Sequence, residues 1–319
     1  MARPTEPGRR LHHFALLTAA ATFLLVIAGG LVTSTGSGLA VPDWPLSYGT
    51  LFPPMVGGIF YEHGHRMVAG GVGLMTMVLA IWLWLRDSRR WLRWLGVAAV
   101  LAVLIQATLG GMTVLFLLPA PISVGHAGLA MAFFSLIASL AVFTSPTWNR
   151  PLVRQPLPGS LPLPRLAVVA TVAVYLQILL GAAVRHTGAG LACPDFPLCN
   201  GSLFPAVDSI GMGLHLAHRG GAAVATILVG WVAWRILRDH RSISQLCFPA
   251  LIALALVVVQ ILLGALTIWS RLAVVLTTAH VAGGALLLVT MVILTLRSHR
   301  VFCCAPAQPA MVSDRKVLA

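Results

Sequence analysis

The chain has 319 residues, of which 58% are hydrophobic and 9% are charged, and it carries a formal net charge of +13. Soluble domains have about 25% charged residues, so this composition excludes a soluble globular protein and indicates an integral membrane protein. The basic residues gather between apolar segments, where they act as an orientation signal and attract anionic lipid. We therefore predict membrane lipid as a partner and no nucleic acid.

Eight apolar segments follow one another along the chain, each close to the roughly 20 residues that a helix needs to cross a bilayer. They cover residues 14–34, 64–85, 94–116, 123–144, 165–186, 214–237, 247–269 and 273–296. A buried soluble core has no room for eight such segments in a chain of this size, and within lipid only helices and closed barrels satisfy the backbone. The sequence therefore predicts an all-α integral membrane protein with eight transmembrane helices.

Seventeen of the 21 basic residues lie at segment ends that would share one side of the membrane. They are Arg3, Arg9, Arg10, Arg86, Arg89, Arg90, Arg93, Arg150, Arg154, Arg165, Arg235, Arg238, Arg241, Arg297, Arg300, Arg315 and Lys316. By the positive-inside rule that side is the cytoplasm, so both termini are predicted to be cytoplasmic. The first 13 residues lead directly into the first segment, which favours an uncleaved anchor and a bacterial cytoplasmic membrane as the location.

An internal repeat runs through the chain at an offset of 152 to 154 residues. Residues 35–46, TGSGLAVPDWPL, return as TGAGLACPDFPL at residues 187–198, and Gln106 returns as Gln260. Because four helices separate equivalent positions, the halves should insert in the same orientation, as two duplicated four-helix bundles. The predicted parts are an N-terminal bundle at 14–144, a cytoplasmic linker at 145–164, a C-terminal bundle at 165–297 and a cytoplasmic tail at 298–319.

One motif occurs twice in this repeat, as EHGHR at residues 62–66 and HLAHR at residues 215–219. Each copy is followed, later in the same half, by a single histidine in another apolar segment. The four candidate iron ligands near the outer ends of the predicted helices are His65, His126, His218 and His280. Two helices that each point one histidine into a four-helix bundle can hold heme iron from both faces. One such histidine alone is more simply explained by a hydrogen bond to a neighbouring helix, but two matched pairs favour two metal or heme sites.

Heme suits these pairs better than a bare metal ion does. A closed zinc site takes four ligands and a redox copper site usually includes sulfur, whereas each half offers two histidines in an apolar surround. Heme brings four equatorial nitrogens, so two histidines complete its iron. The glycines that flank both motifs, at 57–58, 70–71, 211, 213 and 220–221, either let a flat ring approach the backbone or serve helix packing.

With these motifs the chain resembles the heme A synthase family. The resemblance rests on Glu-x-x-His-Arg at 62–66, its His-x-x-His-Arg counterpart at 215–219, the later single histidines and the Thr-Gly-x-Gly loops, and it covers about residues 14–297. It implies conversion of heme O to heme A for cytochrome oxidase, by oxidation of a ring methyl to a formyl group through successive hydroxylations. The implied partners are a heme O synthase and an electron donor.

The resemblance also implies different roles for the two halves. The second half would hold a resident heme b through His218 and His280. The first half would receive the substrate, heme O, near His65 and His126. An iron with two axial histidines has no open position for oxygen, so the resident heme b is expected to carry electrons and the chemistry is expected in the first half.

Glu62 is the candidate catalytic residue, because its counterpart in the second half is His215. A carboxylate here can move protons or stabilise positive charge that develops at the oxidised methyl. The alternatives are an ion pair with Arg66 and a capping role at the helix N-terminus. Arg66 and its counterpart Arg219 either pair with heme propionates or anchor their helices at the membrane interface.

Cys193 and Cys199 lie in the long outer loop of the second half, where an oxidising location and close spacing predict a disulfide. The matching positions of the first loop hold Val41 and Ser47. Members of the family often carry cysteine pairs in these loops, so the chain departs from the pattern in its first half. A cysteine-mediated step beside the substrate heme is therefore not expected.

Two other functions would use the same four histidines. A di-heme b-type cytochrome that transfers electrons in the membrane would keep two hemes after purification and would have no need of Glu62. A non-catalytic heme carrier would bind heme reversibly and form no product from heme O. The carboxylate and the unequal halves favour the synthase, a heme-modifying membrane oxidoreductase.

Overall fold

The computed structural model describes residues 6–149, 162–203 and 205–302, and in this part of the chain the regular structure is helical. The elements are α1 (Glu6–Ser34), α2 (Gly57–Arg86), α3 (Arg90–Leu115), α4 (Ala120–Thr144), α5 (Leu163–His186), the short 3-10 helix η1 (Ala189–Leu191), α6 (Ile210–Asp239), α7 (Ser244–Trp269) and α8 (Val274–Phe302). The eight α-helices are all long and apolar enough to cross a membrane. The predicted all-α membrane protein with eight spans is confirmed. Of the predicted linker and tail, residues 150–161 and 303–319 lie outside the described residues.

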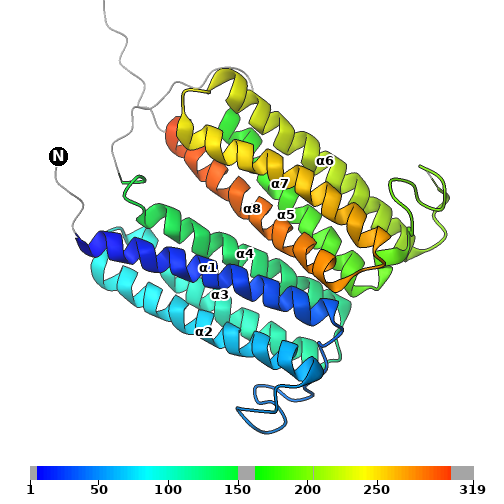
Figure 1. Cartoon of the computed structure of the whole chain (residues 1–319). Coiled ribbons are helices and arrows are strands. Elements are labelled where there is room, and N and C mark those ends of the chain that lie inside the picture. The colour runs from blue at the N-terminus through cyan, green and yellow to red at the C-terminus, as the bar shows by residue number, and fades with distance from the viewer. Residues whose placement is uncertain (1–5, 150–161, 204, 303–319) are drawn as a thin grey trace, which may run out of the picture.

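The helices pack as two groups of four, α1 to α4 and α5 to α8 (Figure 1). In the first group α1 and α3 each contact α2 and α4, and in the second α5 and α7 each contact α6 and α8. The groups meet through α1 and α4 on one side and α5 and α8 on the other. The long loops after α1 and α5 both emerge at the end of the molecule away from the start of α1 (Figure 1). Each group thus forms a ring whose interior receives side chains from four helices.

Apolar side chains lie both inside and outside the two groups. Leu79 and Ile137 are fully buried in the first group, as is Leu288 in the second. On the outer surface Leu24 is 60% exposed and Ile227 is 68% exposed. Since lipid tails are as apolar as these side chains, close packing of the interior, and not removal of apolar surface from water, holds the helices together.

Several helices begin earlier than their apolar segments predicted, and for α2 the difference affects the candidate site. α2 starts at Gly57, whereas the span was predicted from residue 64. The intervening residues include the polar Glu62 and His63, which lower the hydropathy without interrupting the helix. Glu62 therefore lies inside α2, more than one turn from its start.

The long loops after α1 and α5 share one internal structure. The two carboxylate oxygens of Asp43 accept hydrogen bonds from two successive backbone N–H groups, the second from Gly49 at 2.8 Å. Asp195 accepts the same pair, with Gly201 at 2.8 Å. The N–H groups of Gly49 and Gly201 are the main reason that the pKa of each aspartate lies below its ordinary value. Equal loops give the helices that follow them, α2 and α6, equivalent starting positions.

Candidate functional site

Each of the four candidate histidines packs its ring against a glycine on the preceding helix. The pairs are His65 in α2 with Gly29 in α1, His126 in α4 with Gly110 in α3, His218 in α6 with Gly181 in α5, and His280 in α8 with Gly264 in α7. A Cβ atom added to these glycines would lie 3.1, 3.1, 2.9 and 3.4 Å from the Cε1 atom of the respective ring. The missing side chain thus lets each imidazole lie in the groove of its neighbour.

The residue four positions before each glycine also lies beside the histidine ring. These residues are Leu25 beside His65, Gln106 beside His126, Gln177 beside His218 and Gln260 beside His280, and each approaches the ring with its backbone. Residues four apart lie on one face of a helix, so this residue and the glycine form a single seat for the ring. The described chain therefore contains four helical hairpins of one kind, two in each half. The longer repeat was predicted from the sequence, whereas this shorter one was not.

In the second half the geometry fits a single metal held between two imidazoles. The ring centres of His218 and His280 are 6.5 Å apart, with an angle of 83° between the ring planes. Two metal–nitrogen bonds of about 2 Å each, plus about 1 Å from each nitrogen to its ring centre, give about 6 Å for ligands on opposite sides of one ion. Among the described residues no group of three or more His, Cys, Asp or Glu side chains surrounds a common point. The pair suits an iron that brings its own equatorial ligands.

Three of the four rings keep a buried nitrogen without a hydrogen-bond partner among the described residues. These atoms are Nδ1 of His65, His126 and His280. Buried polar atoms are nearly always paired in folded proteins, so each of these nitrogens needs an explanation. The unpaired nitrogens fit sites for a group that binds imidazole.

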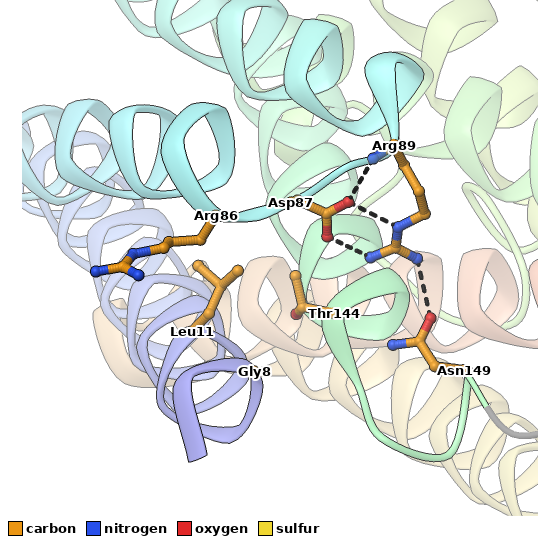
Figure 2. A pocket seen from close by; sticks show the side chains of 7 residues that line it. All are labelled: Gly8, Leu11, Arg86, Asp87, Arg89, Thr144 and Asn149. Atoms are coloured by element: carbon orange, nitrogen blue, oxygen red, sulfur yellow. Dashed lines mark hydrogen bonds and ion pairs between the residues drawn. The ribbon is translucent and has the colours of Figure 1, made fainter. Parts of the chain in front are cut away.

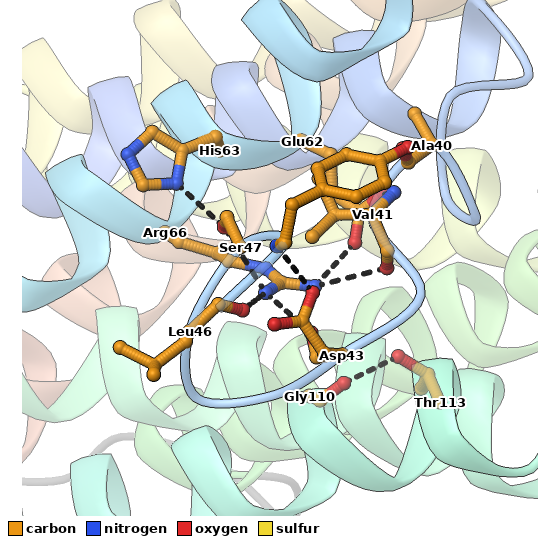
Figure 3. Close-up of polar contacts among 11 residues, drawn as sticks. Ala40, Val41, Asp43, Leu46, Ser47, Glu62, His63, Arg66, Gly110 and Thr113 are labelled. Atoms are coloured by element: carbon orange, nitrogen blue, oxygen red, sulfur yellow. Dashed lines mark hydrogen bonds and ion pairs between the residues drawn. The ribbon is translucent and has the colours of Figure 1, made fainter. Parts of the chain in front are cut away.

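Glu62 is buried, with 4% of its surface exposed, and both of its oxygens are engaged. Oε1 lies 2.6 Å from Nη2 of Arg66, and Oε2 accepts a hydrogen bond of 2.9 Å from the backbone N–H of Val41 (Figure 3). The ion pair with Arg66, one of the two predicted alternatives, is therefore present. The capping alternative is wrong, because α2 begins at Gly57 with Val56 as its N-cap. Glu62 is held rigidly, one turn before His65 on the same face of α2.

Arg66 also fastens the first long loop to α2. Its Nη1 donates to the backbone oxygens of Asp43 (2.8 Å) and Leu46 (2.7 Å) (Figure 3). Arg219 does the same for the second loop, donating to the backbone oxygens of Asp195 (2.7 Å) and Leu198 (2.6 Å). Both guanidinium groups thus organise loop backbone. Their contact with heme propionates stays a prediction.

The predicted disulfide between Cys193 and Cys199 is confirmed, with sulfur atoms 2.04 Å apart. At the Cys199 position of the first loop, the hydroxyl of Ser47 is hydrogen bonded to Nδ1 of His63 at 2.8 Å (Figure 3). Both Ser47 and His63 are buried. The first loop is therefore tied to α2 by a hydrogen bond, whereas the second loop is closed on itself by a covalent bond.

A separate pocket of about 240 Å³ lies at the opposite end of the first group, where α1 begins and α2 ends (Figure 2). It is lined by Gly8, Leu11, Arg86, Asp87, Arg89, Thr144 and Asn149. Asp87 is paired with Arg89 at 2.6 Å, and Arg89 also donates to the side chain of Asn149 at 3.0 Å. These charges satisfy one another at the membrane surface remote from the histidines, so the pocket is no part of the candidate site.

The chain matches the COX15-CtaA family model, described as cytochrome oxidase assembly protein, over residues 12–59 and 57–292. It is 29% identical over 280 residues to the heme A synthase of Bacillus licheniformis, covering 86% of this chain and 91% of that protein. It is 34% identical over 263 residues to the heme A synthase of Halalkalibacterium halodurans, covering 79% and 85%. Identity to the heme A synthase of Alkalihalophilus pseudofirmus is 30% over 301 residues, covering 91% and 99%. The predicted resemblance is confirmed: the chain belongs to the family of cytochrome oxidase assembly proteins that includes the heme A synthases.

Proposed function

We propose that this chain is a heme A synthase, a membrane oxidoreductase that converts heme O to heme A by oxidising one ring methyl through an alcohol to a formyl group. The observation that carries the proposal is the two matched histidine pairs, each ring seated on a glycine of the preceding helix. The similarity to heme A synthases over most of the chain supports it. Heme A would then pass to cytochrome oxidase.

The second half, residues 165–297, holds a resident heme b in this proposal, with His218 and His280 as its axial ligands. The distance and angle between the two rings support this assignment. A heme held from both sides supplies electron transfer, because it has no open position for oxygen. If heme b binds here, the side chains of His218 and His280 would hold its iron, and the group would supply electron transfer.

The first half, residues 14–144, receives heme O between His65 and His126. Glu62 lies one turn from His65, and Arg66 and the Val41 N–H hold its carboxylate in one place. A fixed negative charge in a buried site stabilises positive charge that develops nearby, and it does so without reorganising during the reaction. The ion pair with Arg66 is thus compatible with the catalytic role, since it positions the carboxylate.

The protein lies in the bacterial cytoplasmic membrane with both termini in the cytoplasm and both heme sites toward the outer side. The distribution of basic residues between the helices supports this orientation. A heme O synthase in the same membrane supplies the substrate, and an electron donor completes the reaction. The two bundles act as one protein because α1 and α4 pack against α5 and α8.

The experiment that tests the function is pigment extraction after co-expression with a supply of heme O. Membranes containing this chain are compared with membranes lacking it, and hemes are separated by chromatography and identified by mass. We expect heme A or its hydroxymethyl precursor only in the first sample. Unchanged heme O beside two stably bound b hemes per chain would contradict the synthase and favour a di-heme cytochrome. Reversibly bound, unchanged heme O without stable b hemes would favour a carrier.

A further inference from the structure

The two long outer loops each expose a group of apolar side chains. In the first loop Phe52 is 80% exposed, and Leu51 and Val56 are exposed near it in the chain. In the second loop Leu203 and Val207 are exposed in the same way. We call these two groups the loop tips. Grouped apolar side chains on a surface mark a contact with another molecule or with a membrane, so the tips need an occupant.

The loop tips lie in stretches of sequence without charge. No Asp, Glu, Lys or Arg occurs between Asp43 and Glu62, nor between Asp195 and Asp208. An interface with another protein usually has a polar rim around its apolar centre. Charged side chains are costly in lipid, by contrast, and are therefore rare where a chain enters a membrane. The composition of the tips favours lipid over a protein partner.

The first tip continues the lipid-facing side of α2. Phe60, Met67, Leu74 and Ile81 are all exposed, and their seven-residue spacing places them on one side of this helix. Phe60 lies in the first turn of α2, directly after the loop. In Figure 1 each long loop turns to the side of its group that faces away from the other group. The apolar surface of the helix thus extends onto the loop.

The depth of the tips follows from the tryptophans near the opposite ends of α2 and α6. Trp84 and Trp234 are exposed, and exposed tryptophans gather at the membrane–water interface. Phe60 precedes Trp84 by 24 residues and Ile210 precedes Trp234 by 24 residues, which is about 36 Å of helix. The hydrocarbon core is roughly 30 Å thick, and about 40–45 Å with both headgroup layers. Phe60 and Ile210, which adjoin the tips, therefore lie at the level of the outer headgroups.

We propose that both loop tips insert into the outer leaflet of the membrane, so that each long loop is held by lipid at its tip and by an arginine at its base. Arg66 and Arg219 supply the contacts at the base. The two tips face away from each other, so a single partner protein on one side would cover only one of them, whereas lipid surrounds both. The inference goes beyond the proposed function, because it requires neither heme nor turnover.

Photochemical cross-linking of the full-length protein in its own membranes tests the contact. Phe52 is replaced by the photoreactive analogue p-benzoylphenylalanine, the membranes are irradiated, and the mass of the purified protein is measured. We expect an adduct that carries one phospholipid, at a yield close to that of the same analogue at the lipid-facing Leu74. Leu203 tests the second tip in the same way.

The control position is Ser242, which is exposed in the turn between α6 and α7. The analogue at Ser242 gives the yield of lipid adduct from a turn that does not insert. A yield at positions 52 and 203 no higher than at 242 would overturn the proposal. Adducts of the tips with another protein in place of lipid would also overturn it, and would identify the tips as a docking surface for that protein.

Matched substitutions at one position test whether apolar character holds the first tip in lipid. Phe52→Asp makes insertion costly, whereas Phe52→Leu keeps the tip apolar, and neither should disturb the fold because Phe52 is exposed. Substilisin-type protease of broad specificity is added to the outer side of the protein in liposomes, and each rate is divided by that of the denatured variant. We expect cleavage of the first loop about 10-fold faster in Phe52→Asp than in Phe52→Leu, since burial of one phenylalanine shifts an equilibrium by at least that factor. Equal rates in the two variants would overturn the proposal whether or not the protein forms heme A.

Discussion

The two halves of the molecule are alike in their loops and glycine seats and unlike in the side chains around the histidines. Arg66 and Arg219 fasten the two long loops through equivalent backbone oxygens. Beside the histidines, however, the first half carries Glu62 where the second carries His215, whose Nδ1 lies 3.1 Å from the backbone oxygen of Ala189. The framework that places a ring between helices is thus shared, and under the proposed function the carboxylate that differs is the reason to place the reaction in the first half.

Removal of a candidate heme ligand from the second half should have the largest effect, because it should affect bound heme b whereas the same change in the first half should not. In the proposed function His218 is one of two ligands of a resident heme b, so for His218→Ala we expect nearly complete loss of the low-spin heme b spectrum and of turnover. His65→Ala should leave that spectrum in place, because its ring belongs to the other group of helices. Absorbance and electron paramagnetic resonance spectra of the purified variants decide this. Full low-spin heme b in His218→Ala would refute the assignment of the second half.

Loss of the first-half carboxylate should remove turnover but not heme b. Glu62→Gln keeps the size of the side chain and removes its charge, so stabilisation of developing positive charge is lost, and we expect heme A formation to fall by about 10²- to 10³-fold. The measurement is heme A formed per bound heme b. Glu62→His, which copies the second half at this position, should behave alike. An unchanged rate of turnover in Glu62→Gln would refute the catalytic role of Glu62, and the ion pair with Arg66 would remain as its structural role.

The glycine seats should give graded effects within one half. A Cβ atom at Gly181 would lie 2.9 Å from the ring of His218, whereas one at Gly264 would lie 3.4 Å from that of His280. Gly181→Ala must therefore displace its ring further, and we expect heme b affinity to fall by about 10-fold, with a smaller loss for Gly264→Ala. Heme titration of the heme-depleted protein measures both, and Gly230→Ala, which meets open space in α6, is the control. Equal heme affinities in all three variants would show that Gly181 and Gly264 are not needed to position the histidine rings.

The sequence predicted those features that depend on residue type and spacing along one helix or one loop. Hydropathy located the eight spans, the repeat located the histidine pairs, and the close spacing of Cys193 and Cys199 in an outer loop predicted their disulfide. The seats could not be predicted, because Gly29 and Gly181 are ordinary small residues until the neighbouring helix is placed against them. The available sign was the shared four-residue spacing of Gln106 and Gly110, Gln177 and Gly181, and Gln260 and Gly264.

The lock of the first loop, the hydrogen bond between Ser47 and His63, was also beyond the sequence, because the two residues meet only once the loop has folded over α2.

The two locks should respond differently to a reducing agent, which is the smallest effect expected. Reduction or replacement of Cys193 and Cys199 opens a short covalent loop worth about 2 kcal/mol, whereas Ser47→Ala removes one buried hydrogen bond worth about 1 kcal/mol.

Limited proteolysis of the folded protein measures the cleavage rate of each loop separately. A reducing agent should speed cleavage within residues 187–209 and leave residues 35–56 unaffected, and Ser47→Ala should do the reverse. Because the first lock contains no sulfur, the first half should keep its loop closed when the second loop's disulfide is reduced. Faster cleavage of both loops under reduction would show that the second loop supports the first through the contacts between the two groups of helices, and that the halves are less independent than their separate locks imply.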